Sequence, residues 1–411
     1  MAPTPAWPGG LPKPVFELDD FRVLARRRLP RMVFDFIDGG VDGEAGLQRN
    51  REAFGEWTLL PRYLRDVADR DQTLKLWGRS WRSPVGIAPM GLAGLFRPGA
   101  DLMMAQAARH AGVPLVLSGS SNASIEKVAR EAPGHVWFQL YCTPDDQINR
   151  DLVARAGGAG VDTLVLTVDV TVNANRLRNL RNGFVRPFRL NAAMLGQLLA
   201  HPRWLFEHLR HGGHPMMENW QPYARAGASA DEVADLFAQL TPSAGSTWQT
   251  LENVRRWWPG RLLVKGLLHP ADARQAVALG VDGIVVSNHG ARQLDAAPSP
   301  LAMLPLIRAA VPDVVLGIDS GIRRGSDIVT ALCLGAQFAL CGRPMMHAVT
   351  VAGAAGVARA LKILHHETDR VMAQLGCRAL DELGPDHVRL AGMIGSGPAL
   401  STSMTSMNQE Q

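Results

Sequence analysis

Residues 262–290, LLVKGLLHPADARQAVALGVDGIVVSNHG, contain a strand, a helix and a second strand in immediate succession. The runs Leu262–Val264 and Gly283–Val286 have the length of strands and are apolar throughout, which is typical of a parallel sheet covered on both faces. Between them, Pro270–Leu279 has helical spacing and carries proline at a first-turn position, as helices often do. This segment therefore predicts one strand–helix unit of a parallel α/β fold.

The same rhythm extends along the chain in both directions. Six further runs have the length and composition of strands: Val85–Ala88, Leu115–Leu117, Val136–Leu140, Thr163–Val168, Val314–Ile318 and Phe338–Leu340. Stretches with helical spacing separate them, for example Ala100–Ala111 and Ser326–Leu334, and Gly335 ends the second of these. Eight such units predict a closed (β/α)8 TIM barrel, with a doubly wound sheet as the alternative α/β fold.

Two segments do not follow this rhythm. Before the first strand, Phe21–Leu29 and Arg31–Ile37 have helical spacing, and we expect this N-terminal helical segment to close the bottom or side of the barrel. After the fourth strand, the excursion 173–259 is far longer than a normal crossover, and such loops often serve as lids or docking surfaces. We expect one barrel domain at 15–380 that includes this insertion, a flexible tail at 1–14 and a C-terminal tail at 381–411.

The composition is that of a globular protein, with 46% hydrophobic and 20% charged residues among 411. No apolar run reaches the roughly 20 residues that cross a bilayer, and Met1–Pro14 lacks the basic and apolar regions of a signal peptide. The four cysteines have neither the spacing of a metal site nor the density of a disulfide scaffold. These features together predict a protein of the reducing cytoplasm.

The formal net charge of +5 favours anionic ligands or surfaces. The arginines are scattered, and no stripe of basic residues interleaved with aromatic residues is present, so we expect no nucleic-acid partner. His208, His211 and His214 recur at three-residue steps, which suggests a metal site at first sight. Because Gly212 and Gly213 interrupt the helix and no cysteine or suitable carboxylate is near, we expect no metal there.

Residues that can contact a ligand follow every predicted strand. They are Pro89, Met90, Gly91, Ser118, Gln139, Tyr141, Thr167, Asp169, Lys265, Ser287, His289, Asp319, Gly342 and Arg343. In a barrel these strand ends meet at the C-terminal rim, where such enzymes have their active sites. A single polar residue commonly does no more than end a strand, but eight ends that include Lys, His, Asp and Arg predict one active site.

The loops after the seventh and eighth strands predict a phosphate site. They contain Asp319, Ser320, Gly321, Ile322, Arg323, Arg324 and Gly325 in the first loop, and Gly342, Arg343 and Pro344 in the second. Glycine allows backbone N–H groups to approach an anion closely, and arginine adds charge-assisted hydrogen bonds. In barrels of this class these two loops frequently bind phosphate.

His289 and Arg292 predict acid–base chemistry on a carboxylate-bearing substrate. A histidine at a strand end can act as a base near neutral pH, and the planar guanidinium of Arg292 can hold a carboxylate. Together they would present a 2-hydroxy acid with its carboxylate held and its hydroxyl or Cα proton facing the imidazole. Asp169, after the fourth strand, could orient His289 and stabilise its protonated form.

Lys265 ends the otherwise apolar fifth strand, and a lysine directed into a barrel mouth needs an anionic partner. A reduced flavin carries negative charge near N1 and would be such a partner. Lys265 alone does not exclude the alternative, the Schiff-base lysine of an aldolase or another lyase on the same fold.

Residues 287–295, SNHGARQLD, resemble the signature of the FMN-dependent 2-hydroxy acid dehydrogenases and oxidases. The resemblance runs in order from about Leu18 to Gly376 through LPRMV at 29–33, IAP at 87–89, FQLY at 138–141, LTVD at 166–169, LVKG at 263–266 and RRG at 323–325. Within this family the chain is most similar to the (S)-mandelate dehydrogenase branch, through SNASIE at 121–126, HPRW at 201–204 and IDSG at 318–321.

The resemblance implies FMN as cofactor and a role for each rim residue. His289 would take the proton with the support of Asp169, Arg176 and Arg292 would bind the substrate carboxylate, Tyr141 would contact the substrate, and Lys265 would contact the flavin ring. FMN would also contact Pro89, Met90, Gly91, Ser118, Gln139, Thr167 and Ser287, and its phosphate would lie on Asp319, Ser320, Gly321, Ile322, Arg323, Gly342 and Arg343.

Phe36 departs from the family pattern, in which this position is a tyrosine whose hydroxyl binds the substrate carboxylate. The missing hydrogen bond to an ionised group corresponds to about 1.5–3 kcal/mol. A compensating group, a different substrate or a weaker affinity would each be consistent with this change. A flavin-binding protein with weakened turnover is therefore an alternative function.

Two further positions bear on the substrate and the electron acceptor. Ser120 stands where oxidases of short substrates tend to carry tryptophan, so we expect a pocket for an aromatic or bulky side chain. Gly91 stands where oxidases usually have alanine, which by resemblance favours a dehydrogenase that reduces a quinone. A soluble oxidase that reduces O₂ to H₂O₂ is the alternative.

The insertion contains two short amphipathic stretches, Ala192–Ala200 and Pro202–Arg210, which carry leucines and aromatic residues near Arg189, Arg203 and Arg210. Basic amphipathic helices can lie in a membrane interface, and the mandelate dehydrogenases use the equivalent segment in this way. We expect residues 190–220 to make a peripheral contact with the inner face of the cell membrane, or to form a lid packed on the barrel or a neighbouring subunit. The family resemblance also implies a homo-oligomer, commonly a tetramer.

Overall fold

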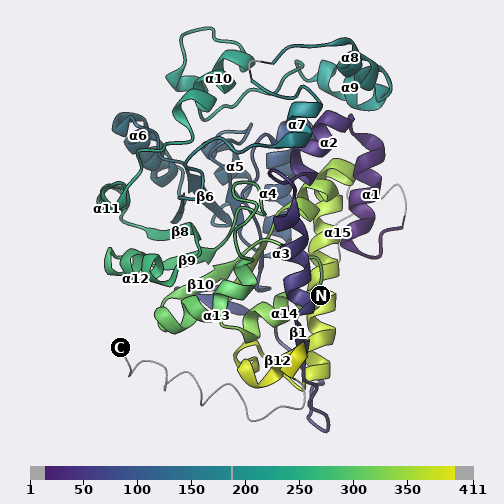
Figure 1. Ribbon diagram of the computed structural model, residues 1–411, viewed down its shortest axis with the longest axis vertical. Helices are drawn as coiled ribbons and strands as arrows, with labels where there is room; N and C mark the ends of the chain where they lie inside the picture. Colours follow the sequence, from purple (N-terminus) through teal and green to yellow (C-terminus); the bar gives the residue numbers. More distant parts are fainter. Residues whose placement is uncertain (1–13, 187, 394–411) are drawn as a thin grey trace.

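The computed structural model describes residues 14–186 and 188–393, and its centre is a closed barrel of parallel strands (Figure 1). The strands follow one another around the barrel in chain order: β4 (Val85–Ile87), β5 (Leu115–Leu117), β6 (Val136–Leu140), β7 (Thr163–Thr167), β8 (Arg261–Leu267), β9 (Gly283–Val286), β10 (Val315–Ile318) and β11 (Phe338–Cys341). Closure is direct, because Ala339 of β11 pairs with Val85 of β4. The predicted (β/α)8 barrel is confirmed, and the doubly wound alternative is wrong.

Helices surround the barrel and connect its strands in sequence. They are α4 (Ala100–Ala111), α5 (Ile125–Glu131), α6 (Asp146–Gly158), α11 (Trp248–Trp257), α12 (Pro270–Ala278), α13 (Pro300–Ala310), α14 (Gly325–Cys333) and α15 (Arg343–Leu375). Side-chain caps fix several of their first turns, since Ser124, Asp145 and Ser299 each accept a hydrogen bond from a backbone N–H of the helix that follows.

The barrel interior is packed at its N-terminal end, so only the opposite rim is available to a ligand. A hairpin of β2 (Leu74–Leu76) and β3 (Arg79–Trp81) lies against the inward-facing core. The Trp137 ring packs against Trp81 and Phe338, with centroid distances of 6.1 and 5.5 Å. Aromatic packing of this kind fills the lower barrel and leaves the strand ends above it to carry polar groups.

The N-terminal segment covers the side of the barrel, as expected. It forms α1 (Leu18–Arg28), α2 (Arg31–Asp38) and α3 (Ala45–Gly55), and α1 packs along α15 (Figure 1). The segment expected as a C-terminal tail from residue 381 includes β12 (Val388–Leu390), which pairs with β1 (Trp57–Leu59). Short strands that pair only with a distant partner carry little signal in the sequence. The remainder of that tail, and all but Pro14 of the expected N-terminal tail, lie outside the described residues.

The insertion lies over the rim of the barrel (Figure 1). It contains α7 (Leu177–Arg181), α8 (Ala192–Leu199), α9 (Pro202–Arg210) and α10 (Ala230–Leu240) before it rejoins the barrel through α11. Helix α9 is anchored from below, since the Trp204 indole donates to the Leu95 carbonyl at 2.9 Å and the His208 ring lies 3.0 Å from the Gly94 carbonyl. The two predicted amphipathic stretches are thus helices.

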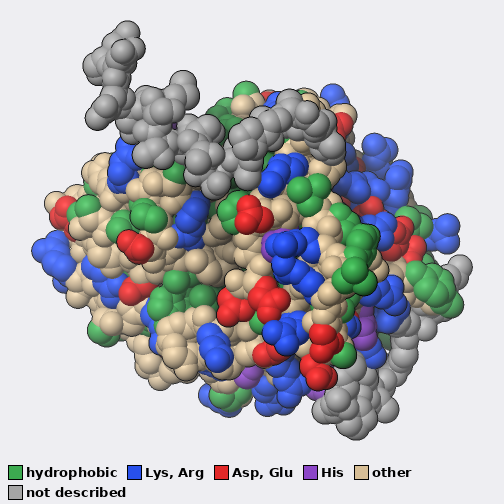
Figure 2. All heavy atoms as spheres, turned by 90° about the horizontal axis from the view of Figure 1, so that it is seen from below, with side chains coloured by type: hydrophobic (Ala, Val, Ile, Leu, Met, Phe, Trp, Pro, Cys, Tyr) green, Lys and Arg blue, Asp and Glu red, His purple; other side chains and the backbone are tan. Residues whose placement is uncertain are grey.

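Within the described residues, α15 is the one helix long and apolar enough to cross a membrane, and 78% of its most apolar window is buried. It is therefore a core helix of the barrel layer, with a kink at Ala352 and Gly353. Figure 2 shows the molecule from below, on the side away from the insertion, where acidic and basic side chains are interspersed. That face has the mixed charge of an ordinary solvated surface.

Candidate active site

A cavity of about 320 Å³ opens at the carboxyl ends of the barrel strands, between the rim and the insertion. Most of the predicted site residues line it: Phe36, Pro89, Met90, Gly91, Tyr141, Arg176, Lys265, His289, Arg292, Asp319, Ser320, Gly321, Ile322, Arg323, Gly342 and Arg343. The other five, Ser118, Gln139, Thr167, Asp169 and Ser287, lie directly behind the lining and are hydrogen-bonded to it or to one another. The structure therefore brings the whole predicted set together.

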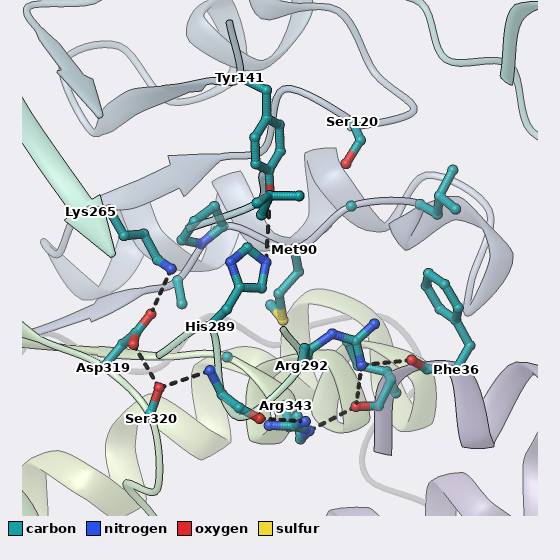
Figure 3. A pocket seen from close by; sticks show the side chains of 18 of the residues that line it. Phe36, Met90, Ser120, Tyr141, Lys265, His289, Arg292, Asp319, Ser320 and Arg343 are labelled. Atoms are coloured by element: carbon teal, nitrogen blue, oxygen red, sulfur yellow. Dashed lines mark hydrogen bonds and ion pairs between the residues drawn. The ribbon is translucent and has the colours of Figure 1, made fainter. Parts of the chain in front are cut away.

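His289 and Asp169 form a pair at the rim, in which the His289 imidazole lies in the cavity (Figure 3) and Asp169 lies behind the lining. The Nδ1 atom of His289 lies 2.8 Å from a carboxylate oxygen of Asp169, so the ring donates there and Nε2 is left as the free basic atom. On its other side, Nε2 lies 3.5 Å from the Tyr141 hydroxyl. Burial lowers the pKa of His289, although Asp169 partly offsets this effect, so the imidazole is uncharged and able to accept a proton at neutral pH.

The loop that carries His289 is held in an unusual backbone conformation. His289, Gly290 and Ala291 all have positive φ, at 58°, 65° and 56°. Residues with a Cβ rarely adopt this region, and strained backbone of this kind is concentrated at functional sites. A side chain at Gly290 would also collide with Arg343, whose Nη1 lies 2.6 Å from the ideal Cβ position. The strain turns the imidazole into the cavity.

Lys265 lies at the bottom of the cavity with its charge compensated. Its ammonium group is 3.3 Å from Asp319 and donates to the Ser287 hydroxyl at 2.9 Å (Figure 3). Burial acts to lower the pKa of Lys265, but Asp319 and Asp169 outweigh it and raise the pKa. A Schiff-base lysine needs a lowered pKa to be nucleophilic, so this environment disfavours a role for Lys265 as the Schiff-base lysine of an aldolase.

A hydrogen-bonded row of side chains lies beside Lys265, at the ends of β5, β6 and β7. The Ser118 hydroxyl donates to the Gln139 carbonyl oxygen at 2.9 Å, and the Gln139 amide donates to the Thr167 hydroxyl at 2.8 Å. All three side chains are buried. Such a row offers donors and acceptors to the edge of a planar heterocycle.

Five arginines line the cavity: Arg186 from the insertion, and Arg176, Arg292, Arg323 and Arg343, which were predicted as site residues. Arg343 donates to the carbonyl oxygens of Ile37 and Gly39 at 2.8 and 2.9 Å, and Arg292 donates to Phe36 and Gly39 at 2.8 and 3.1 Å. Because these carbonyl acceptors are uncharged, they orient the guanidinium groups of Arg292 and Arg343 without neutralising their positive charge. Burial and the neighbouring Arg323 lower the pKa of Arg343 to about 9, so an anion at this place would be strongly attracted.

The residues present fit FMN. A phosphate would find Arg323, Arg343 and the glycines of both loops on one side of the cavity, and an isoalloxazine ring would find Lys265 and the Ser118–Gln139–Thr167 row on the other. Arg176 points to a second anion, because its Nε is buried without a hydrogen-bond partner. The cation surplus therefore accommodates both a cofactor phosphate and a substrate carboxylate.

Phe36 occupies the position of the expected tyrosine and lies between the two arginines nearest the substrate. Its ring is 5.3 Å from the Arg292 guanidinium and 6.0 Å from that of Arg176, within cation–π range. The Phe36 ring also packs edge-on against Phe184, with centroids 5.5 Å apart. The missing hydroxyl is thus accompanied by an aromatic cluster.

The sequence reasoning missed the residues that cover the cavity from the insertion: Arg186, Met217, Ala234, Phe237, Ala238, Thr241 and Pro242. Ala234 and Ala238 are one helical turn apart on α10, so they belong to the same helix face. Only the length of the excursion signalled a lid, and nothing in its composition indicated which of its residues reach the cavity.

Comparison with known proteins agrees with this geometry. The family model of the FMN-dependent dehydrogenases matches residues 25–390. The (S)-mandelate dehydrogenase of Pseudomonas putida is 40% identical over 384 residues, which cover 93% of this chain and 96% of the relative. An L-lactate dehydrogenase of Xanthobacter autotrophicus is 39% identical, with coverage of 90% of this chain and 95% of the relative.

Among solved structures, the crystal structure of the monotopic membrane protein (S)-mandelate dehydrogenase superimposes with a TM-score of 0.88 at 40% identity, and covers 92% of this chain and all of that one. The match includes the barrel and most of the chain outside it. From the site geometry and these similarities together, the chain belongs to the FMN-dependent dehydrogenase family, with FMN as its cofactor.

Proposed function

We propose that this protein oxidises a 2-hydroxy acid with an aromatic or similarly bulky side chain to the 2-keto acid, with His289 as the base. The observation that carries the proposal is the free Nε2 of His289, which faces the cavity while Asp169 holds Nδ1 at 2.8 Å and two uncompensated arginines stand nearby. The relatives named for mandelate and lactate dehydrogenation support the same substrate class.

Each residue has a definable task in this reaction. Arg176 and Arg292 bind the substrate carboxylate, which places the hydroxyl-bearing carbon within reach of His289. Nε2 of His289 takes one proton from the substrate, and Asp169 stabilises the imidazolium that forms. The Tyr141 side chain contacts the substrate near its hydroxyl group. FMN would supply the chemistry that side chains lack, namely the acceptance of two electrons together with the second hydrogen that the substrate loses.

Lys265 and Asp319 define the electrostatics on the cofactor side. The ammonium of Lys265 would stabilise negative charge on a reduced flavin, while Asp319 keeps that ammonium protonated. Arg323, Arg343 and the backbone of residues 320–322 and 342 would hold the phosphate. Pro89, Met90 and Gly91, after β4, would lie along one face of the ring.

The bulky-substrate preference rests on the shape of the cavity. Met217, Ala234, Phe237 and Ala238 form an apolar wall of the cavity, in which the Phe237 ring packs against Tyr141, and Ser120 leaves open the space that a tryptophan would fill. Gly91 is part of the same packing, since a Cβ there would lie 2.0 Å from the Ser120 hydroxyl. A larger side chain at position 91 would therefore require the Ser120 side chain to move.

The direct test is anaerobic bleaching of the bound flavin across a panel of 2-hydroxy acids, followed by admission of air. Bleaching by mandelate-like acids with slow reoxidation in air, and rapid reoxidation by a quinone, is the expected result. Fast reoxidation with release of H₂O₂ would instead establish an oxidase. A lack of bleaching by every acid would contradict the proposed function and favour a flavin protein with weakened turnover.

We further propose that helices α8 and α9 bind the surface of the cell membrane from the cytoplasmic side. Leu190, Leu195, Leu199, Phe206 and Leu209 are exposed, the last two at 64% and 66%. Arg189, Arg203 and Arg210 are exposed beside them and suit anionic headgroups. The relative whose structure is described as monotopic supports this arrangement. We also propose that the protein forms a homo-oligomer. Light scattering would measure its oligomeric state.

A further inference from the structure

The turn that follows α2 connects the two segments that carry the substrate arginines. Its backbone N–H at Val41 donates to the Ala291 carbonyl at 3.1 Å, directly before Arg292. At the next residue, the N–H of Asp42 donates to the Asn175 carbonyl at 2.9 Å, directly before Arg176. The Asn175 amide also donates to the Asp42 carboxylate at 2.8 Å. The turn is thus a junction between both segments.

Arg178 holds this junction together through three carboxylates. Its guanidinium forms ion pairs with Asp38 at 3.2 Å and Asp35 at 3.5 Å, both on α2, and with Glu44 at the end of the turn. Glu44 in turn accepts from the Gly40 N–H at 2.9 Å, which fixes the turn itself. Two-thirds of the Arg178 side chain is removed from solvent, since its exposure is 32%.

The position of α2 determines where Arg292 points. Arg292 donates to carbonyl oxygens at the end of α2, those of Phe36 and Gly39. Arg176 lies two residues before Arg178 and begins α7 as its N-cap. A side chain that ties α7 to the end of α2 therefore sets the spacing between the two guanidinium groups.

These two groups need such a restraint. Among the described residues, neither Arg176 nor Arg292 has an ion pair with a carboxylate, and both flank the ring of Phe36. Burial and the charge of Arg176 lower the pKa of Arg292, which reports repulsion between like charges in a desolvated place. In the part of the chain that the structure describes, none of the three carboxylates around Arg178 lines the cavity or forms an ion pair with Arg176 or Arg292, so these two guanidinium groups keep their charge for a ligand.

We propose that Arg178 is a positioning residue that holds Arg176 and Arg292 at the separation needed to bind one substrate carboxylate. This inference rests on the proposed function, because it concerns binding of the 2-hydroxy acid. In the family pattern a tyrosine hydroxyl at position 36 gives the carboxylate an additional hydrogen bond. In this protein the restrained pair of guanidinium groups takes over that role.

The test compares Arg178→Met and Arg178→Lys with Arg181→Met, a matched control that removes an exposed arginine of the same helix. Holoenzymes are assayed with mandelate for KM and kcat, and titrated with phenylglyoxylate and its neutral amide by flavin absorbance. We expect Arg178→Met to raise KM and the Kd of phenylglyoxylate about tenfold or more, a change of ~1.4 kcal/mol per factor of ten. The kcat and the Kd of the amide should change much less, and Arg178→Lys should recover part of the loss.

Equal weakening of the carboxylate and the amide would overturn the proposal, since it would mean that Arg178 only supports the fold. An unchanged KM in both Arg178 variants would also overturn it. If Arg178→Met does not fold, Glu44→Gln removes one ion pair of the same cluster, and the same selective loss of carboxylate binding is required there. Bleaching of the wild-type flavin by mandelate, measured in the same series, tests the proposed function separately.

Discussion

The barrel rim and the insertion above it contribute to one cavity in different ways. The rim supplies charged and polar side chains from the carboxyl ends of buried strands, as with Lys265 near the end of β8 and His289 after β9. The insertion supplies Arg176 and Arg186 together with apolar side chains from α10 and its neighbouring loops. We infer from this difference that the rim carries the base and the cofactor contacts, while the insertion adds one substrate arginine and an apolar wall that selects the side chain of the substrate.

The largest effect should come from the rim. His289→Gln removes the base while it leaves the Arg323 and Arg343 region untouched, so we expect kcat to fall by roughly 10⁴-fold with FMN still bound. Stopped-flow bleaching gives the rate, and the absorbance ratio of flavin to protein gives the FMN content. Survival of more than about a tenth of the activity would show that another group takes the proton.

Asp169→Asn should have the next largest effect, about 10²–10³-fold on kcat/KM, because the imidazolium loses its partner. The pH profile gives the sign. His289 must be uncharged to act, so activity falls as pH decreases through its pKa, which burial places below the ordinary value of about 6.5. Since Asp169 raises that pKa, its removal should move the acidic limb to still lower pH. A shift of the acidic limb to higher pH would contradict the pairing of Asp169 with His289.

The apolar wall should show a smaller and selective effect. Ala238→Phe on α10 adds a ring to the cavity, so we expect kcat/KM for mandelate to fall about 10–100-fold while that for lactate changes little. Kinetics with both acids measure the ratio. Ala230→Phe, at the start of the same helix but outside the cavity lining, is the control. Equal losses on both substrates would mean that α10 does not select the side chain.

Phe36→Tyr lies at the boundary between the two regions. If Arg176 and Arg292 already bind the carboxylate fully, the added hydroxyl should lower KM by less than about tenfold, below the full value of a hydrogen bond to a charged group. Inhibition by phenylglyoxylate provides an independent measure of carboxylate affinity. A gain of about 100-fold would instead identify Phe36 as the cause of a weakened site.

The smallest effect on turnover is expected at the outer surface of the insertion. Phe206→Ser with Leu209→Ser removes two exposed apolar side chains of α9, so binding to vesicles with anionic lipids should be lost while kcat with a soluble acceptor is unchanged. Co-sedimentation with vesicles measures the first and dye reduction the second. The pair Val23→Ser and Phe16→Ser, also exposed but outside the insertion, should leave vesicle binding intact.

The strands and the rim residues could be predicted because both follow from local sequence. A buried parallel strand is apolar throughout, and its end is where a polar residue first appears, so the runs at 136–140 and 283–286 matched the observed strands β6 and β9. Closure of the barrel then makes residues that are distant in sequence converge. No long-range contact had to be known to expect His289 near Asp169.

Other features depended on tertiary contacts and were missed or misplaced. Strand β12 is stabilised by its pairing with β1, more than 300 residues earlier, and its own sequence carries no turn or periodicity that predicts it. The side of α10 that faces the cavity was equally hidden, because alanine is common on any helix face. The junction of Arg178 with Asp35, Asp38 and Glu44 exists only once α7 is placed beside α2.

The sequence by itself thus determined the barrel, through its apolar strands, and the cofactor class, through the resemblance of its motifs to a known family, while His289 as the base stays a prediction drawn from its place at a strand end. Only the tertiary structure decided how the two substrate arginines are oriented, which apolar side chains close the cavity, and which face of α9 is exposed. Orientation and burial result from packing between elements that are far apart in the chain, and local sequence patterns do not encode that packing.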